Sequence, residues 1–206
     1  MIGKIQKNYF TVENLSFHTF SKITFSLSSA ECIGLSGPSG VGKSLFLRAL
    51  ADLDSHQGTI CLEGVVATSI PAPLWRRQVA LLPTEAAWWF DTVGEHFNET
   101  NHEWLSLLDF DQTVLKWNIN RLSSGEKQRL ALLRVLCNHP KVLLLDEPTA
   151  NLDSVNSQRV ENLIVRLRQQ REVAVIWVSH NIDQLKRVAT RHFTLNTVGF
   201  KEAATI

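Results

Sequence analysis

A glycine-rich segment that ends in lysine and serine is the strongest chemical signal in this 206-residue chain. The run Gly37-Pro-Ser-Gly-Val-Gly-Lys-Ser44 fits the pattern G-x-x-x-x-G-K-[ST]. Its glycines allow a curled backbone whose N–H groups face one anion. A helix expected to begin near Lys43 adds its positive N-terminal end. The spacing therefore predicts a phosphate-binding loop in a nucleotide site.

This loop supplies most of the predicted nucleotide contacts. Lys43 is long enough to reach the β- and γ-phosphates, and the Ser44 hydroxyl can ligate Mg²⁺. The alternative is a chance glycine turn before a helix, and the short apolar run Cys32–Leu35 just ahead of the loop disfavours it. The expected nucleotide-binding residues are Gly37, Pro38, Ser39, Gly40, Val41, Gly42, Lys43, Ser44 and Leu45, and the motif leaves open which nucleotide they bind.

Two carboxylates follow a second apolar run, Val142–Leu145. Buried carboxylates are costly unless they are paired or bind a metal, and the carboxyl ends of parallel strands are where α/β folds bind ligands. We expect Asp146 to hold Mg²⁺, directly or through water, and Glu147 to orient or deprotonate an attacking water. Without the phosphate loop nearby, a solvated strand end would be the better interpretation.

The elements that must position these residues alternate between strand-like and helical patterns. Such alternation predicts an α/β fold with a largely parallel sheet. Ile23–Leu27 alternates polar and apolar residues, which is typical of an edge strand. Helices are expected over Lys43–Leu53, with Leu45, Leu47, Leu50 and Leu53 on or near one side, and after Asp153. The expected strands are Ile23–Leu27, Cys32–Leu35, Gly58–Leu62, Val79–Leu82, Val142–Leu145 and Val173–Val178.

Residues 85–138 differ in composition from the rest of the chain, because they are rich in aromatic residues and show no strong strand pattern. We interpret them as a helical lobe inserted into one domain whose core is formed by about residues 1–84 and 139–206. The aromatic residues of the lobe are Trp88, Trp89, Phe90, Phe97 and Trp104.

Composition narrows the classes of function. Hydrophobic residues make up 44% and charged residues 20%, which suits a folded domain, and the net charge of +1 gives no reason to expect a nucleic-acid partner. The apolar runs are too short to span a bilayer, and the start of the chain lacks the apolar segment of a secretory signal. Cys32, Cys61 and Cys137 form neither a disulfide framework nor a CxxC pair.

Three further segments resemble the motifs of one family, the ABC ATPases. Leu122-Ser-Ser-Gly-Glu-Lys-Gln-Arg129 is similar to the family's signature motif, Pro148-Thr-Ala-Asn-Leu-Asp153 to its D-loop, and Trp177-Val-Ser-His180 to its switch-histidine strand. The motifs keep the family's order over residues 37–180. The resemblance implies a P-loop NTPase core with antiparallel N-terminal strands and an inserted helical lobe.

The resemblance also implies roles for single residues. In this family two domains pair head to tail around two ATP molecules with Mg²⁺. Asp153 would cross to the partner's phosphate loop, and His180 would bind the γ-phosphate and position the water with Glu147, so that Glu147 and His180 are the implied catalytic residues. The residues that would face the nucleotide of the opposite subunit are Ser123, Ser124, Gly125 and Glu126.

The chain departs from the family pattern at three places. Ser124 stands where a glycine is usual, a small change that we expect to be tolerated. Thr84 stands where the family has a glutamine that contacts Mg²⁺ and relays movement to the membrane partner; Glu85 or a water are possible substitutes. The aromatic residue that stacks on adenine is not fixed, and Phe17, His18 and Phe20 remain candidates.

The function implied by the resemblance is that of an ATP-hydrolysing subunit, forming a homodimer, of an ABC transporter whose permease is a separate chain. Such a subunit lies in the cytoplasm on the inner face of the membrane, and the chain's length resembles that of small bacterial exporter ATPases. A soluble ABC-type ATPase and a nucleotide switch without turnover are the alternatives. Trp88-Trp89-Phe90 either receives the permease or fills the lobe's own core.

Overall fold

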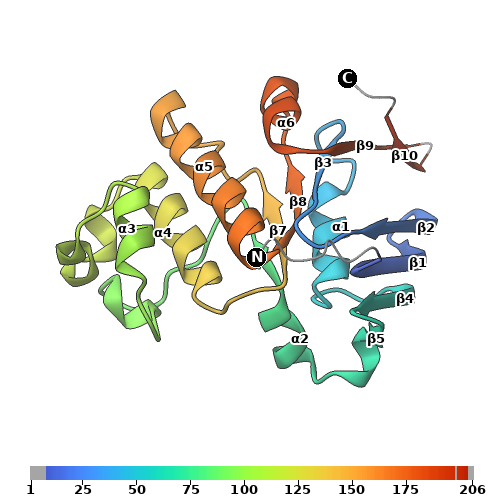
Figure 1. Ribbon diagram of the computed structural model, residues 1–206, viewed down its shortest axis with the longest axis horizontal. Coiled ribbons are helices and arrows are strands. Elements are labelled where there is room, and N and C mark those ends of the chain that lie inside the picture. Colours follow the sequence, from blue (N-terminus) through green and yellow to red (C-terminus); the bar gives the residue numbers. More distant parts are fainter. Residues whose placement is uncertain (1–7, 198, 204–206) are drawn as a thin grey trace.

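The computed structural model describes residues 8–197 and 199–203, which form two sheets with helices between and beside them (Figure 1). The start of the chain, which lacks the apolar segment of a secretory signal, lies outside the described residues apart from Asn8. The expected domain limits at residues 1 and 206 lie outside them as well.

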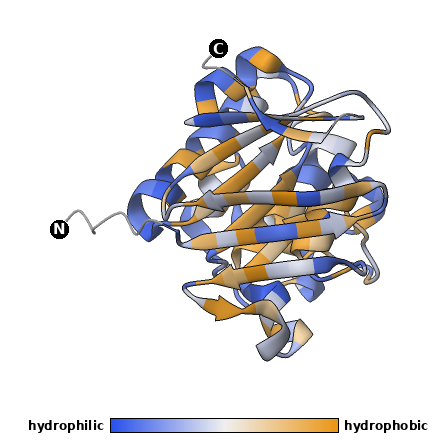
Figure 2. Ribbon diagram, turned by 90° about the vertical axis from the view of Figure 1, so that its right-hand side faces the viewer, coloured by the Kyte–Doolittle hydropathy of each residue, from blue (hydrophilic) through white to orange (hydrophobic). Residues whose placement is uncertain are grey.

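The smaller sheet is antiparallel and its strand order is β2-β1-β4-β5. β2 lies at its edge, as its alternating pattern predicts, and its buried and exposed residues alternate over much of its length. Figure 2 shows this sheet facing the viewer, with polar and apolar residues mixed along each strand. Its strands are β1 (Phe10–Phe17), β2 (Phe20–Leu27), β4 (Gln57–Leu62) and β5 (Val65–Val66).

The larger sheet has the order β10-β9-β3-β8-β7-β6 and is parallel except for β10, which runs antiparallel to β9. The prediction of a largely parallel sheet is confirmed. The two C-terminal strands, β9 and β10, are additions that the sequence patterns did not indicate. The strands of the larger sheet are β3 (Cys32–Ser36), β6 (Val79–Leu82), β7 (Val142–Asp146), β8 (Ala174–Val178), β9 (Arg191–Asn196) and β10 (Gly199–Glu202).

Six α-helices connect the strands of the described residues. α1 lies between the two sheets, whereas α5 and α4 lie on the other face of the larger sheet (Figure 1). The helices are α1 (Lys43–Leu50), α2 (Ala72–Gln78), α3 (His102–Leu107), α4 (Ser124–Leu136), α5 (Ser154–Arg171) and α6 (Ile182–Val188). Short 3₁₀ turns span Ala67–Ser69, Gly94–His96, Gln112–Lys116 and Ile119–Arg121.

β7 shows why the central strands are continuous apolar runs. All five of its residues are buried, because the strand is covered on both faces. Val142 and Leu144 pack into the cluster that contains α1, while Leu143 and Leu145 pack into the cluster that contains α4 and α5. The sheet thus divides two hydrophobic cores and holds the carboxyl end of β7 rigidly between them.

α1 ends earlier than the sequence predicts, at Leu50 instead of Leu53. Asp52 adopts a left-handed φ of 55°, and the Leu53 N–H then donates to the carbonyl of Arg48, which closes the helix. The buried face is also rotated from the expected one. Leu47 and Leu50 are buried as expected, but Leu45 and Leu53 are exposed, and Phe46 takes a place in the core.

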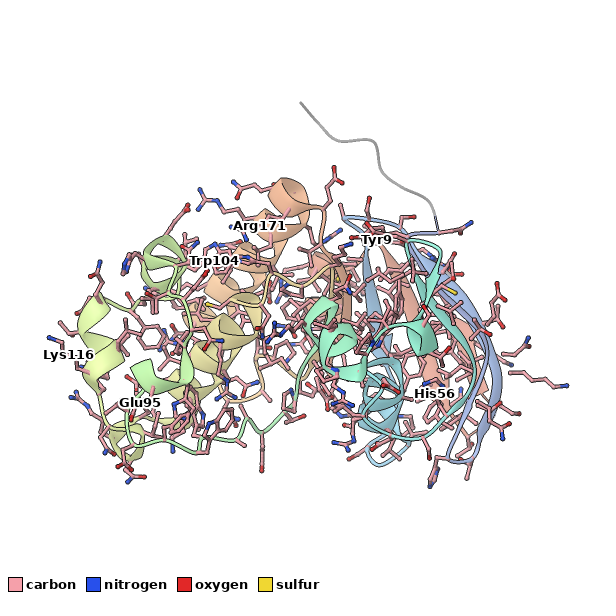
Figure 3. The ribbon with its side chains drawn as sticks, turned by 90° about the horizontal axis from the view of Figure 1, so that it is seen from below. Tyr9, His56, Glu95, Trp104, Lys116 and Arg171 are labelled. Carbon is pink, nitrogen blue, oxygen red and sulfur yellow. The ribbon has the colours of Figure 1, made fainter. Side chains whose placement is uncertain are left out.

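Residues 85–138 contain α3, α4 and three 3₁₀ turns but none of the named strands, which agrees with the expected helical lobe. An aromatic contact ties the lobe to the core domain: the Arg171 guanidinium lies 4.6 Å from the centre of the Trp104 ring. Figure 3 shows these two labelled residues close together where α5 ends, with Glu95 and Lys116 farther out in the lobe. The lobe is therefore held at the far end of α5 as well as by its own core.

Two other expectations concern the whole described chain. None of its described helices is long and apolar enough to cross a bilayer. Cys32, Cys61 and Cys137 are all free thiols, and burial raises the pKa of the Cys32 thiol to about 12, so this thiol is unreactive at neutral pH.

We predict that Trp75→Phe lowers the free energy of unfolding by about 1–3 kcal/mol. The Trp75 side chain is fully buried, and its Nε1–H donates to the carbonyl of Leu50 at the end of α1 (3.1 Å). The variant leaves both a cavity and an unpaired carbonyl. Urea denaturation measures the loss. Trp89→Phe is the matched control, because Trp89 is 62% exposed, and equal losses in the two variants would contradict the prediction.

Candidate active site

The glycine-rich segment forms a tight loop between β3 and α1, as predicted. Gly42 takes a φ of 108°, which a residue with a side chain rarely adopts, immediately before the first turn of α1. A Cβ at Gly37 would lie 2.1 Å from the carbonyl oxygen of Leu195 on β9. Only glycine fits there, because β9 runs directly against the loop. The loop is therefore shaped by a strand far away in the sequence.

Lys43 occupies the centre of this loop. Its Nζ donates to the carbonyl oxygens of Gly37 and Pro38, each at 2.9 Å, and its side chain is buried. Burial lowers the pKa of the Lys43 ammonium, and the carboxylates of Glu147 and Asp146 offset part of that shift. The ammonium thus sits inside the loop, where phosphate oxygens can replace the two carbonyls as acceptors.

Three neighbouring strands bring the charged residues together. β8 lies between β3 and β7, so the residues that follow these strands meet at one edge of the sheet. His180 Nε2 lies 3.4 Å from Lys43 Nζ and 3.6 Å from Glu147 Oε1. Lys43, His180 and Glu147, which the sequence places in three separate motifs, form one cluster.

Glu147 has an unusual backbone conformation, a buried carboxylate oxygen and a raised carboxyl pKa. Its backbone φ is 50°, and its N–H donates to the carbonyl of Val178 on β8. Its Oε1 is buried without a hydrogen-bond partner among the described residues. Burial raises the pKa of the Glu147 carboxyl, and His180 and Lys43 offset part of the rise. A strained residue with a raised carboxyl pKa beside a phosphate loop suits a group that accepts a proton.

Oxygen ligands suitable for a metal lie at the same edge. Asp146 is 6% exposed at the last position of β7, and Ser44 is exposed in the first turn of α1. Mg²⁺ is typically held by one or two protein oxygens together with phosphate oxygens and water. A carboxylate and a hydroxyl flanking the phosphate loop fit this ion.

The signature segment begins α4. The Ser123 hydroxyl accepts from the Glu126 N–H (3.2 Å), and Glu126 Oε2 accepts from the Ser123 N–H (2.8 Å), which forms a capping box. The Ser123 hydroxyl proton stays available for an acceptor outside the chain. Ser124 occupies the first helical position and is exposed, so a hydroxyl in place of the family's glycine meets no steric obstacle.

The signature segment does not lie at the phosphate loop of its own chain. Figure 1 shows α5 between α4 and α1. The signature segment lies instead beside the segment that leads into α5, because a Cβ at Gly125 would come within 3.0 Å of the Asn151 carbonyl oxygen. Asp153 caps α5 by accepting from the Asn156 N–H, which holds the pKa of the Asp153 carboxyl below its usual range. Ser123, Ser124 and Asp153 are all exposed.

The residue that replaces the family's glutamine follows β6, the strand next to β7. Thr84 is half-buried at this position, and Glu85 beside it is exposed. No described hydrogen bond joins either side chain to Glu147, Asp146 or Ser44. The sequence expectation that Thr84 is too short for the glutamine's reach remains a prediction.

Of the three candidates for the adenine-stacking residue, two belong to the core. Phe17 and Phe20 are buried and stack on each other with ring centres 5.3 Å apart, and Phe17 also contacts Phe46 of α1. His18 is exposed in the turn between β1 and β2 and lines a shallow cavity of about 470 Å³. Phe17 and Phe20 line the same cavity, but His18 is the one of the three whose side chain is exposed.

The segment Trp88-Trp89-Phe90 is expected either to receive a permease or to fill the core of the lobe, and the structure shows one half-buried and two exposed side chains. Trp88 packs against the hydrophobic cluster that contains α4 and α5, whereas Trp89 and Phe90 are 62% and 48% exposed. His96, which the sequence analysis missed, holds them in place: its Nε2 accepts from the backbone N–H groups of both residues, each at 3.0 Å. His96 lies seven residues after Trp89 and six after Phe90, which is not a spacing that indicates such a contact from sequence.

A comparison with family models matches residues 20–150 to the ABC transporter model. Among curated relatives, "ABC transporter I family member 17" of Arabidopsis thaliana is 36% identical over 180 residues, which cover 81% of this chain and 68% of the relative. The "Probable iron export ATP-binding protein FetA" of Escherichia coli (strain K12) is 35% identical over 178 residues, 80% of this chain and 79% of the relative.

Solved structures share the fold. The dimeric post-hydrolysis state of an ATP-binding cassette bound to ADP and Pi aligns with a TM-score of 0.82 at 20% identity, covering 96% of this chain and 99% of that one. The predicted architecture of a P-loop core with an antiparallel sheet and a helical lobe is confirmed by this likeness.

We predict that Glu147→Gln raises the melting temperature of the nucleotide-free protein at about pH 7.5. Because the pKa of Glu147 is raised on folding from its usual 4.5, the folded protein holds this proton more tightly than the unfolded chain. Stability is therefore lost as pH rises from that usual value through the raised one. The variant carries no such charge and escapes this loss.

The same comparison at about pH 3 should show little difference, since Glu147 is then protonated in both states. Thermal unfolding at several pH values makes the measurement. Glu13→Gln, at an exposed glutamate of β1, is the control. A variant less stable than wild type at the higher pH would refute the argument.

Proposed function

The chain belongs to the ABC transporter family as an ATP-binding ATPase, and from that premise we propose that it drives transport through a separate membrane-spanning chain. One observation supports the assignment of the site. At the ends of three adjacent strands, His180 Nε2 lies 3.4 Å from Lys43 Nζ and 3.6 Å from Glu147 Oε1. The remaining residues are assigned by where they lie relative to this cluster.

We propose that hydrolysis divides among these residues as follows. The loop N–H groups and Lys43 bind the β- and γ-phosphates. The attacking water transfers a proton to a Glu147 oxygen while its own oxygen bonds to the γ-phosphorus and the bond to the β–γ bridging oxygen breaks. ADP and phosphate are the products. His180, within reach of both Lys43 and Glu147, donates a hydrogen bond to the γ-phosphate and aligns the water.

Ser44 and Asp146 are the residues that we propose to hold Mg²⁺. When bound, this ion neutralises charge that develops on the phosphate oxygens. The chain's own contribution is to fix a hydroxyl at the start of α1 and a buried carboxylate at the end of β7. His18 is our choice for the side chain that stacks on adenine, because it alone of the three candidates is exposed.

A second copy of the chain completes the proposed site. α4, which begins just after Ser123, and α1, which begins at Lys43, lie on opposite sides of α5 (Figure 1), so the signature residues would reach a γ-phosphate that a partner holds. The hydroxyl proton of Ser123 and the N-terminal N–H groups of α4 are suitable anion donors. Asp153, exposed at the start of α5, would face the partner's phosphate loop.

Trp89 and Phe90 support a docking surface for the permease. They are exposed on the lobe, and Arg134 lies 4.8 Å over the Trp89 ring, so the surface combines aromatic rings with a cation. An apolar helix of a membrane partner fits such a surface. This partner would place the ATPase on the cytoplasmic face of the membrane. One relative is named for iron export, and we therefore take a metal ion as the hypothesis for the exported cargo.

A nucleotide switch without turnover is the second candidate, and Thr84 is the observation that favours it. A half-buried threonine replaces the glutamine that the family uses toward Mg²⁺ and the permease. The intact cluster of Glu147 and His180 argues for turnover.

We predict that wild type hydrolyses Mg·ATP and that Glu147→Gln lowers kcat by about 100-fold or more, since the group that accepts the proton is lost. The variant still binds ATP and accumulates as a dimer. Steady-state phosphate release and light scattering on the same samples measure both effects. A variant that hydrolyses ATP as fast as wild type would remove Glu147 from the chemistry.

Wild type that binds ATP without turnover would favour the switch or a need for the partner. Thr84→Gln separates these two. Turnover gained by this variant alone indicates that the threonine disabled the site, whereas no gain indicates that the permease is required.

We predict that Trp89→Ser combined with Phe90→Ser abolishes co-sedimentation with membranes of the source cell, because an exposed aromatic surface is lost. Affinity for ATP should not change. Leu74→Ser on α2, at a leucine that is 48% exposed, is the matched control for general loss of apolar surface. Equal loss of membrane association in the control would contradict a specific docking surface.

A further inference from the structure

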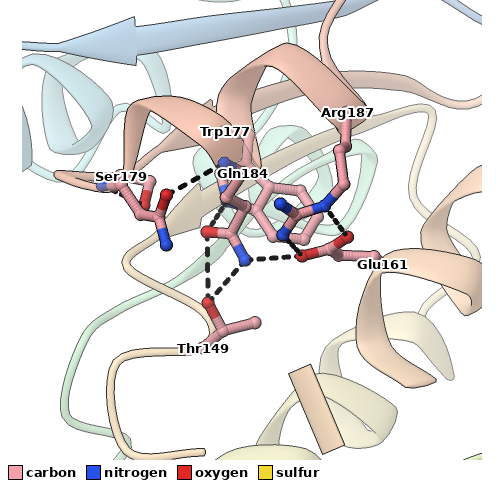
Figure 4. Close-up of polar contacts among 7 residues, drawn as sticks. Thr149, Glu161, Trp177, Ser179, Gln184 and Arg187 are labelled. Atoms are coloured by element: carbon pink, nitrogen blue, oxygen red, sulfur yellow. Dashed lines mark hydrogen bonds and ion pairs between the residues drawn. The ribbon is translucent and has the colours of Figure 1, made fainter. Parts of the chain in front are cut away.

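A buried glutamine joins the segments that carry the two catalytic groups. Gln184 lies in the first turn of α6 and is 3% exposed, so its amide must find partners within the protein. Figure 4 shows its side chain at the centre of a polar network between Trp177, Thr149 and Glu161. These three residues come from β8, from the segment after β7, and from α5.

Each polar atom of the Gln184 amide is used. Its Nε2 donates to Thr149 Oγ1 and to Glu161 Oε1, both at 2.9 Å. Its Oε1 accepts from Trp177 Nε1 at 3.3 Å. A buried amide with all of its partners present fixes a single rotamer, because every alternative leaves a polar group unpaired.

The network is closed by a charged pair. Arg187 donates to both oxygens of Glu161, at 2.8 and 3.0 Å, so the Glu161 carboxylate is neutralised without Gln184. The two residues also line the cleft of about 610 Å³ that reaches Glu147 and His180. Removing the Gln184 amide therefore leaves the ion pair intact, and the effect of a substitution reports on the other two contacts.

Those other contacts connect the catalytic groups. Thr149 lies two residues after Glu147, and Trp177 lies three residues before His180. We propose that Gln184 is a positioning residue, which sets the spacing between Glu147 and His180 by tying the segment after one to the strand before the other. The inference rests on the proposed function, because it takes Glu147 and His180 as the groups that act on the γ-phosphate.

A positioning role makes a prediction that plain packing does not. Gln184→Met keeps the length and volume of the side chain but removes its amide. We expect kcat for ATP hydrolysis to fall about 10-fold or more, since displacements near 1 Å between reacting groups carry such costs. The KM for ATP should stay within about twofold, because the phosphate loop and His18 are not in contact with Gln184.

The matched control is Gln158→Met. Gln158 lines the same cleft from α5, but it is exposed and its side chain makes no hydrogen bond that the structure describes. Its kcat and KM should equal those of wild type. A fall in kcat of the same size in both variants, or a Gln184→Met enzyme with wild-type kcat, would overturn the proposal.

A second measurement separates this inference from the proposed function. Amide hydrogen exchange of the nucleotide-free protein needs no turnover. Gln184→Met should speed exchange in residues 147–152 and in 178–181 together, and Gln158→Met in neither. Unchanged exchange in either segment overturns the proposal even if wild type hydrolyses ATP. Faster exchange in both supports it even if the chain proves to be a switch.

A double-mutant cycle tests whether Thr149 carries the effect. Thr149→Val keeps the shape of the side chain and removes its hydroxyl. If Gln184 acts through Thr149, the double variant should lose no more exchange protection in residues 147–152 than Gln184→Met alone. Additive losses would show that the two residues act independently, which contradicts the proposed tie.

Discussion

The parallel hydrogen-bonded ladder that joins β3, β8 and β7 is the constraint on which the site depends. It aligns the carboxyl ends of the three strands, so that Lys43, His180 and Glu147 meet although they lie far apart in the chain. Burial on both faces keeps these strands from shifting, since a slip in register moves apolar side chains out of both cores. Because the strands are fixed, the distances among Lys43, His180 and Glu147 at the edge of the sheet are fixed as well.

The cost of this arrangement is concentrated at Glu147. The residue combines a positive φ, a buried oxygen without a partner and a raised carboxyl pKa, each of which destabilises the fold. The neighbouring sheet and the Gln184 network supply the order that holds it there. An energetic penalty at the position proposed to accept a proton is consistent with a group selected for chemistry rather than for stability.

One chain carries the parts of a nucleotide site on separate surfaces. The phosphate loop opens at the edge of the larger sheet, whereas the signature segment lies across α5 in contact with the segment that precedes Asp153. Under the proposed function, the meeting of two chains would complete the contacts to the γ-phosphate.

The sequence by itself determined what local chemistry can determine. The spacing of Gly37, Gly42 and Lys43 specified a phosphate loop, and the apolar runs specified buried strands, because each depends on neighbours within a few residues. The tertiary structure alone decided which residues touch. It brought Leu195 against Gly37, placed Gln184 between Thr149 and Trp177, moved Phe17 into the core, and shortened α1 at Leu50. Contacts of this kind depend on sheet order and on packing between distant segments, and no local pattern carries that information.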